Sequence, residues 1–112
     1  MFEDLIVEEA RRRREIFNNL PRYLEIIIDT VKSLDENARI YLFGSVAESR
    51  YLLSSDIDIL VVTRLRPEEV IAALWNRGIR DPFEIHVVNE DLFEIYRKRA
   101  RLMELTKNNI KA

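Results

Sequence analysis

The first third of the chain spaces its apolar residues at helical intervals. Residues 3–19 predict one helix, in which glutamates precede arginines by four residues, the favourable order for ion pairs along a helix. Pro21 predicts the start of a second helix, because a proline in the first turn loses no helical hydrogen bond. Its apolar residues follow the 3.6-residue period closely, so we expect this helix to pack on a core. They are Leu24, Ile27, Ile28, Val31 and Leu34, whereas the first helix has a rougher stripe of Phe2, Leu5, Ile6, Ala10, Phe17 and Leu20.

The middle of the chain changes to short β-prone runs around one helix. Residues 39–43 and 83–88 predict strands. Residues 56–63 predict a strand that is apolar on both faces after its first residues, as in the centre of a sheet. Residues 67–77 predict a helix that begins with a proline and ends before a glycine.

The last predicted helix spans residues 89–107, with Asn89 suited to cap its start. The side chains that we expect this helix to direct inward are Leu92, Phe93, Tyr96 and Met103. Strands that alternate with helices predict an α/β (α+β) fold with one small mixed β-sheet and helices packed mainly on one face. The other face would stay open for a ligand or a partner.

Composition narrows the classes of protein that fit this fold. Apolar residues make up 47% of the 112 residues and charged residues 34%, which is typical of one globular domain. The net charge is −2, so nucleic acid is an unlikely partner, because phosphate binding usually needs a basic excess. There is no cysteine, hence no disulfide or thiolate metal site. We find neither a signal peptide nor a membrane-length apolar run, and expect a soluble, cytoplasmic protein.

Two aspartates at the start of the central strand are the sharpest chemical feature. Asp56 and Asp58 are two residues apart, so both carboxylates would project from one face of a strand, while Ile57, Ile59 and Val61 would point the other way into the core. Close carboxylates repel each other unless a cation lies between them, and Mg²⁺ prefers such oxygen ligands. The alternative is a solvated strand end, with the aspartates as turn residues.

Glu84 strengthens the metal interpretation, because it interrupts an otherwise apolar strand. If that strand lies beside the strand of Asp58, Glu84 completes a three-carboxylate cluster; the alternative is an ion pair with an arginine. His86 shares its face by the two-residue rule. We interpret His86 as a hydrogen-bonded structural residue rather than a ligand.

Gly44 and Ser45 follow the first predicted strand and form a second group of candidate binding residues. A glycine there lets the backbone turn tightly and approach a ligand. A serine that opens a helical turn offers a hydroxyl and free N–H groups to phosphate oxygens. The alternative is an ordinary turn.

The arginines at 11–14 and the basic run at 97–101 are interpreted as solvated faces, with a partner surface as the alternative.

These residues together resemble the minimal nucleotidyltransferases of the DNA polymerase β-like superfamily. In that family Gly-Ser is followed by ten residues and then Asp-x-Asp, usually preceded by Ser. Here the motif reads Gly44-Ser45, residues 46–55 and Asp56-Ile57-Asp58, with Ser55 before the first aspartate. Glu84 matches the family's third carboxylate on a later strand. The resemblance implies a single nucleotidyltransferase domain over 1–112, with N-terminal helices at 3–35, a catalytic core at 39–88 and a C-terminal helix at 89–107.

The resemblance also implies an activity, the Mg²⁺-dependent transfer of a nucleoside monophosphate, AMP from ATP, to a hydroxyl of a protein or small-molecule acceptor. Asp56, Asp58 and Glu84 would be catalytic and would hold a two-metal site, of Mg²⁺ or of Mn²⁺ in its place. Gly44, Ser45 and Ser55 would bind the nucleotide. Small family members are typically encoded beside a helical HEPN-domain protein and act as its antitoxin. Such a partner is therefore implied, and a homo-oligomer also stays open.

Three departures from the family pattern keep other interpretations open. The family often has Arg at the position of Val46, Gly at that of Ser49 and Asp at that of Glu84. A longer acid moves the carboxylate by about one methylene, and misplacement by about 1 Å costs on the order of 10²-fold in rate. One alternative is thus a weak or inactive binding module that neutralises a partner by contact. The other is an unrelated α/β domain with a coincidental motif.

Overall fold

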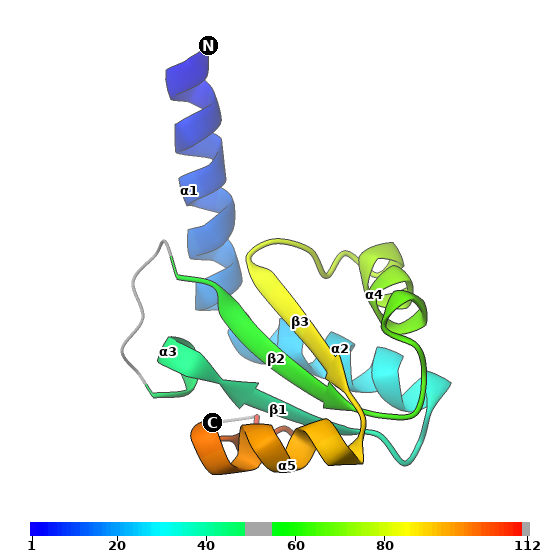
Figure 1. The fold of residues 1–112 in the computed structure, drawn as a ribbon. Helices are drawn as coiled ribbons and strands as arrows, with labels where there is room; N and C mark the ends of the chain where they lie inside the picture. The colour runs from blue at the N-terminus through cyan, green and yellow to red at the C-terminus, as the bar shows by residue number, and fades with distance from the viewer. Residues whose placement is uncertain (49–54, 111–112) are drawn as a thin grey trace.

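The computed structural model describes residues 1–48 and 55–110, and Figure 1 labels their helices and strands. The helices are α1 (Phe2–Asn18), α2 (Leu20–Leu34), α3 (Gly44–Ala47), α4 (Pro67–Asn76) and α5 (Glu90–Arg99). The strands are β1 (Arg39–Phe43), β2 (Ile57–Val62), β3 (Phe83–Val88) and β4 (Met103–Glu104). Within the described residues, no helix has the length and apolar character needed to cross a membrane.

The four strands form one mixed sheet in the order β3-β2-β1-β4. β2 pairs parallel with β3, and α4 connects the two, because parallel neighbours need a crossover. β1 is antiparallel to both β2 and β4. The mixed α/β architecture predicted from the sequence is therefore confirmed.

The main core lies on the face of the sheet that α2 and α4 cover. Alternate residues of β2 point to this face, and Ile57, Ile59 and Val61 are completely buried there, as predicted. The apolar side of α2 packs on the same core through Leu24, Ile27, Ile28 and Val31, while α4 contributes Val70 and Leu74. Burial of this apolar surface is the main stabilisation of the fold.

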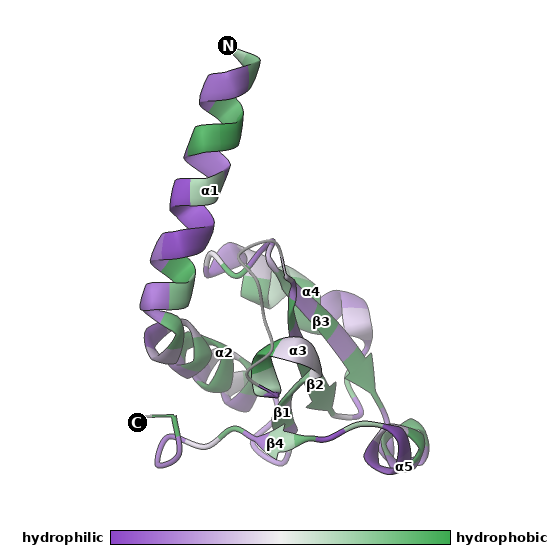
Figure 2. Ribbon diagram, turned by 90° about the vertical axis from the view of Figure 1, so that its left-hand side faces the viewer, coloured by the Kyte–Doolittle hydropathy of each residue, from purple (hydrophilic) through white to green (hydrophobic). Residues whose placement is uncertain are grey.

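A smaller core lies on the opposite face, under α5. Leu60, Val62 and Val88 of the strands pack there against Phe93 of α5. Figure 2 shows α2 and α5 on opposite sides of the strands. The helices thus lie mainly on one face, and α5 covers part of the other.

The predicted last helix is wrong beyond Arg99. α5 ends there because Ala100 has an extended backbone, with φ −134° and ψ 151°. The chain then forms β4, which pairs with β1 through Leu42 and Met103. This pairing satisfies backbone groups of β1 that would otherwise lie at an open sheet edge.

The inward face predicted for the last helix is only partly correct. Phe93 is buried and Tyr96 is half-buried, as predicted. Leu92 is 47% exposed, and Met103 is 44% exposed because it belongs to the edge strand β4. Leu105, one residue after β4, is buried instead.

α1 projects away from the sheet, and only its last turns contact the rest of the chain (Figure 1). Ile16 is buried, whereas Phe2, Leu5 and Ile6 are 75%, 70% and 54% exposed. The apolar stripe expected along this helix therefore packs only at its C-terminal end.

Arg12 and Arg13 hold the C-terminal half of α1 to the loops of the sheet. The Arg13 guanidinium donates to the Ser55 carbonyl at 3.2 Å and lies 3.1 Å from the Asp81 carboxylate. Arg12 also donates to the backbone carbonyl of Asp81. The Arg13 side chain is only 16% exposed. The solvated face predicted for residues 11–14 is therefore wrong for Arg13, whereas the side chain of Arg12 is 43% exposed.

Candidate active site

Two acids lie side by side on the parallel strands β2 and β3. Asp58 is the register partner of Glu84, so both carboxylates leave the same face of the sheet at the same level. This is the face that α5 partly covers, because Ile57 and Ile59 on either side of Asp58 point to the main core. The Asp58 side chain is 25% exposed and that of Glu84 55%. Both acids are therefore accessible to a ligand.

His86 lies on the same face, two residues beyond Glu84. Its Nε2 is 3.4 Å from Asp58 Oδ1 and 3.7 Å from Glu84 Oε1. One ligand atom from each of these three residues lies within 4.8 Å of the other two. From the sequence, His86 was interpreted as a hydrogen-bonded structural residue, and its Nε2 does lie within hydrogen-bond distance of Asp58 Oδ1. Its two-residue spacing from Glu84 also places it on the face of the two acids.

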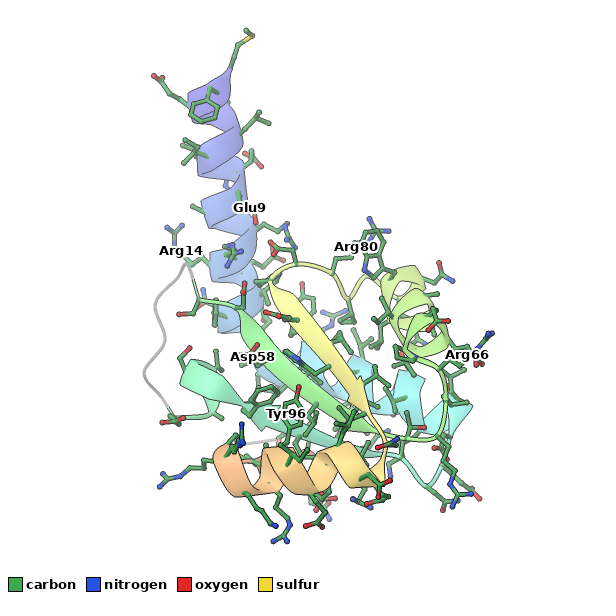
Figure 3. The ribbon with its side chains drawn as sticks, in the orientation of Figure 1. Glu9, Arg14, Asp58, Arg66, Arg80 and Tyr96 are labelled. Carbon is green, nitrogen blue, oxygen red and sulfur yellow. The ribbon has the colours of Figure 1, made fainter. Side chains whose placement is uncertain are left out.

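Two aromatic rings surround the His86 imidazole. The rings of Phe43 and His86 meet edge to face with centroids 5.1 Å apart, and the Tyr96 ring lies 6.3 Å from His86. Figure 3 shows Tyr96 rising from α5 on the side of the sheet that carries Asp58. The aromatic side chains on this face of the sheet therefore lie directly beside its charged and polar side chains.

Gly44 is required at the end of β1 for two reasons. Its φ is +79°, a conformation that residues with a side chain rarely adopt. A Cβ at this position would collide with Oδ2 of Asp58 and would lie 3.3 Å from Asp58 Cγ. The preceding residue, Phe43, is the register partner of Asp58. The glycine turn thus lies directly against the carboxylate.

The other predicted site residues lie around this centre. Ser45 is half-buried in the short helix α3, which begins at Gly44. Ser55 is half-buried, and its carbonyl accepts the hydrogen bond from Arg13. Asp56 is exposed and directly precedes β2. The departure at Ser49 lies outside the described residues.

Asp56 does not belong to the group of close ligand atoms that the described residues form. Among these residues, no arginine forms an ion pair with Asp56, Asp58 or Glu84. The predicted grouping of acids from two neighbouring strands is thus observed for Asp58 with Glu84, with His86 beside them, and the role of Asp56 stays a prediction.

The donor set fits a divalent cation. The carboxylate oxygens of Asp58 and Glu84 that lie within 4.8 Å of each other repel each other. A cation between them would attract both. Carboxylate oxygens suit Mg²⁺ and Mn²⁺, and an imidazole nitrogen suits the transition metals. Asp58, Glu84 and His86 could therefore hold the ion, with its outer side open to solvent and substrate.

A glycine turn between a strand and a short helix lies next to acids on two adjacent strands of a mixed sheet. This is the arrangement of a class of protein that could hold phosphates and a divalent cation. Sequence comparison assigns the family within this class. Residues 24–110 match the family described as "Nucleotidyltransferase domain", and the chain belongs to that family. The helix α1 lies outside the matched residues.

Solved structures with similar folds agree with this assignment. One is a "putative nucleotidyltransferase" of 27% sequence identity and TM-score 0.61, with 73% of this chain and 96% of that chain covered. Another is a "putative nucleotidyltransferase from Sulfolobus solfataricus" of 25% identity and TM-score 0.53, with 88% of this chain and 83% of that chain covered. Proteins with curated descriptions gave no match. The family and the fold support nucleotidyl transfer as the general class of activity.

Proposed function

We propose that this chain is a Mg²⁺-dependent nucleotidyltransferase that moves AMP from ATP to a hydroxyl of a protein or small-molecule acceptor. In this reaction the acceptor oxygen forms a bond to the α-phosphorus while the bond from that phosphorus to pyrophosphate breaks. The hydroxyl proton is lost to solvent. The observation that carries the proposal is the contact of the Gly44 turn with Asp58, beside Glu84 on the next strand.

The chain's own residues would position the triphosphate. Gly44 has no side chain, so the backbone of the turn can approach the β- and γ-phosphates closely. The Ser45 hydroxyl and the Ser55 hydroxyl would donate hydrogen bonds to phosphate oxygens. Positioning of this kind accounts for much of the rate of such transfers.

The acids would hold the cation. Asp58 and Glu84 lie together, and Asp56 would join them from its exposed place before β2 when nucleotide is bound. A bound Mg²⁺, or Mn²⁺ in its place, would neutralise charge on the phosphates and lower the pKa of the attacking hydroxyl. The proximity of Glu84 to Asp58 supports a functional role for the longer acid.

A radioactive transfer assay tests the proposal. The chain is incubated with Mg²⁺, ATP labelled at the α-phosphorus and the HEPN-domain protein that the resemblance implies as its partner, and label on that protein is measured. We expect label with wild type and none with an Asp56→Ala, Asp58→Ala double variant. Asp91→Asn is the matched control, because Asp91 is an exposed acid at the start of α5, away from the cluster. Equal label in wild type and double variant would refute the proposal.

A second candidate function is neutralisation of a partner by contact alone. It is favoured by α1, whose side chains Phe2, Leu5 and Ile6 are exposed on a projecting helix. The partner we propose is the helical HEPN-domain protein that the family resemblance implies, with this chain as its antitoxin. If the double variant still binds and silences that protein, contact suffices. If it binds without silencing, transfer is required.

A further inference from the structure

We propose that His86 is a metal ligand, whose Nε2 joins Asp58 and Glu84 on one cation and makes the site prefer Mn²⁺ over Mg²⁺. This inference rests on the proposed function, because it concerns the cation of the same site. It goes beyond that function by assigning a nitrogen ligand and a metal preference.

The three groups lie close enough to share one ion, and the contact between His86 and Asp58 is a long hydrogen bond. Nε2 of His86 is 3.4 Å from one carboxylate oxygen and 3.7 Å from another. Hydrogen bonds from nitrogen to oxygen are usually about 2.9–3.0 Å long, and one nitrogen has one proton to donate. Adjacent ligand atoms about 2.1 Å from one six-coordinate ion lie about 3.0 Å apart, so these groups would move slightly closer together when they bind one ion.

The surroundings of His86 fix the direction of its imidazole. Phe43 and Tyr96 contact the ring edge to face, at centroid distances of 5.1 and 6.3 Å. Its side chain is 27% exposed, close to the 25% of Asp58. The nitrogen therefore faces the carboxylates from a ring that its neighbours restrict, which is the arrangement of a pre-positioned ligand.

The chemistry of the third donor decides the metal preference. Mg²⁺ is a hard cation that takes oxygen ligands and keeps several waters. Imidazole nitrogen is a ligand for first-row transition metals, and Mn²⁺, although the weakest binder of that series, accepts it more readily than Mg²⁺, which keeps to oxygen ligands. With His86 as a ligand, the site should therefore bind Mn²⁺ more tightly than Mg²⁺. The ratio of the two affinities should be larger than in a site made of carboxylates alone.

The chain contains one histidine, which makes the proposal directly testable. The untagged protein is loaded with Mn²⁺ in the presence of inorganic tripolyphosphate, so that no nucleobase nitrogen is present. Pulsed electron paramagnetic resonance then measures coupling of the manganese to nitrogen. We expect imidazole coupling in wild type and its replacement by the ¹⁵N pattern after labelling with ¹⁵N-histidine.

Bound Mn²⁺ without histidine coupling would overturn the role of His86 and leave the proposed function intact. Failure of the wild type to bind Mn²⁺ at all would instead overturn the metal site of the proposed function, and this inference with it. The wild-type spectrum decides between these outcomes without depending on a variant.

Variants test the preference. His86→Asn should lose the coupling and weaken Mn²⁺ binding by at least about tenfold, with a smaller change for Mg²⁺. Asp58→Asn should lose binding of both ions, and Asp91→Asn should change neither. Circular dichroism checks that each variant is folded. Equal weakening of Mn²⁺ and Mg²⁺ by His86→Asn would contradict the preference.

Discussion

At the scale of single residues, Gly44 and Gly78 share a backbone conformation but have different neighbours. Their φ values are +79° and +86°. A Cβ on Gly44 would collide with Asp58, whereas a Cβ on Gly78 would meet nothing within 4 Å. A substitution at Gly78 would therefore cause backbone strain alone, whereas one at Gly44 would cause the same strain and also disturb the site.

We predict that Gly44→Ala and Gly78→Ala each lower the free energy of unfolding by roughly 1–2 kcal/mol, because both place an L side chain at positive φ. Only Gly44→Ala should also displace the Asp58 carboxylate and reduce transfer by about 10²-fold or more. Denaturant titrations measure the first effect and label transfer the second. An equal loss of activity in both variants would show that strain alone is responsible.

Asp35 gives the fold a predictable response to acid. The Thr63 hydroxyl donates a 2.6 Å hydrogen bond to its carboxylate, and the Asn37 N–H donates another at 3.0 Å. These bonds, the one from Thr63 first, hold the Asp35 pKa below its ordinary value of 3.8. A carboxyl with a lowered pKa in the folded state stabilises the protein above its unfolded pKa and loses this effect as pH falls through the folded value.

We therefore predict that the stability advantage of wild type over Asp35→Asn is constant above about pH 5 and shrinks as pH falls through 3.8 and below. Urea denaturation at a series of pH values measures it. Thr63→Val should raise the Asp35 pKa back toward its ordinary value in an NMR titration. A gap that widens as pH falls would contradict the assignment.

At the scale of elements, Arg13 connects α1 to the segment before β2. Arg13 contacts the Ser55 carbonyl and the Asp81 carboxylate, whereas Arg11 forms an ion pair with Glu8 of its own helix. The side chain of Arg11 is 67% exposed and that of Arg13 16%. Arg13 is thus the stronger anchor of the backbone at Ser55, next to Asp56.

We predict that Arg13→Ala lowers both the melting temperature and the transfer rate, since it frees the backbone next to Asp56 and leaves the Asp81 carboxylate without this partner. Arg11→Ala, the matched control on the same helix, should change each by little, because exposed ion pairs contribute about 0–1 kcal/mol. Differential scanning fluorimetry and label transfer are the measurements. A similar loss in both variants would mean that general charge on α1, rather than this contact, matters.

The elements that could be predicted are those with a clear period. Alternation along β2 indicated that Ile57, Ile59 and Val61 face the core, and α2 followed its helical stripe. β4 could not be predicted, because a strand of two residues has no period and forms only where β1 offers an open edge. The end of α5 at Arg99 was missed because nothing in the sequence showed that the residues after it form an edge strand.

The two-residue periodicity of a strand predicted only part of the candidate site. That rule placed Glu84 and His86 on one face, but only the pairing of β2 with β3 brings them to Asp58. His86 was interpreted as structural because a lone histidine on a strand is more often hydrogen-bonded than a ligand, and sequence spacing within one strand does not identify Asp58 as its partner across the sheet. The role of Asp56 stays a prediction, since β2 begins one residue after it.

At the scale of the whole molecule, the family match and the packing both leave out the first turns of α1. Residues 24–110 match the family, and they contain the sheet, the acids and every buried core residue except Ile16. The first turns of α1 stand outside both (Figure 1). A helix without tertiary contacts is marginal in water when it is shorter than about 12–15 residues. These turns are therefore the least stabilised part of the fold.

We predict that the backbone amides of residues 6–11 exchange with deuterium quickly in the isolated chain, while those of α2 are protected by the core. Hydrogen exchange followed by mass spectrometry measures both segments in one experiment. Slow exchange at 6–11 that speeds up on dilution would instead mean that a second copy covers α1. Protection that appears only when the proposed HEPN-domain partner is added would place that partner on α1. The exposed side chains Phe2, Leu5 and Ile6 would then be the contact surface, at the opposite end of the helix from the anchor at Arg13.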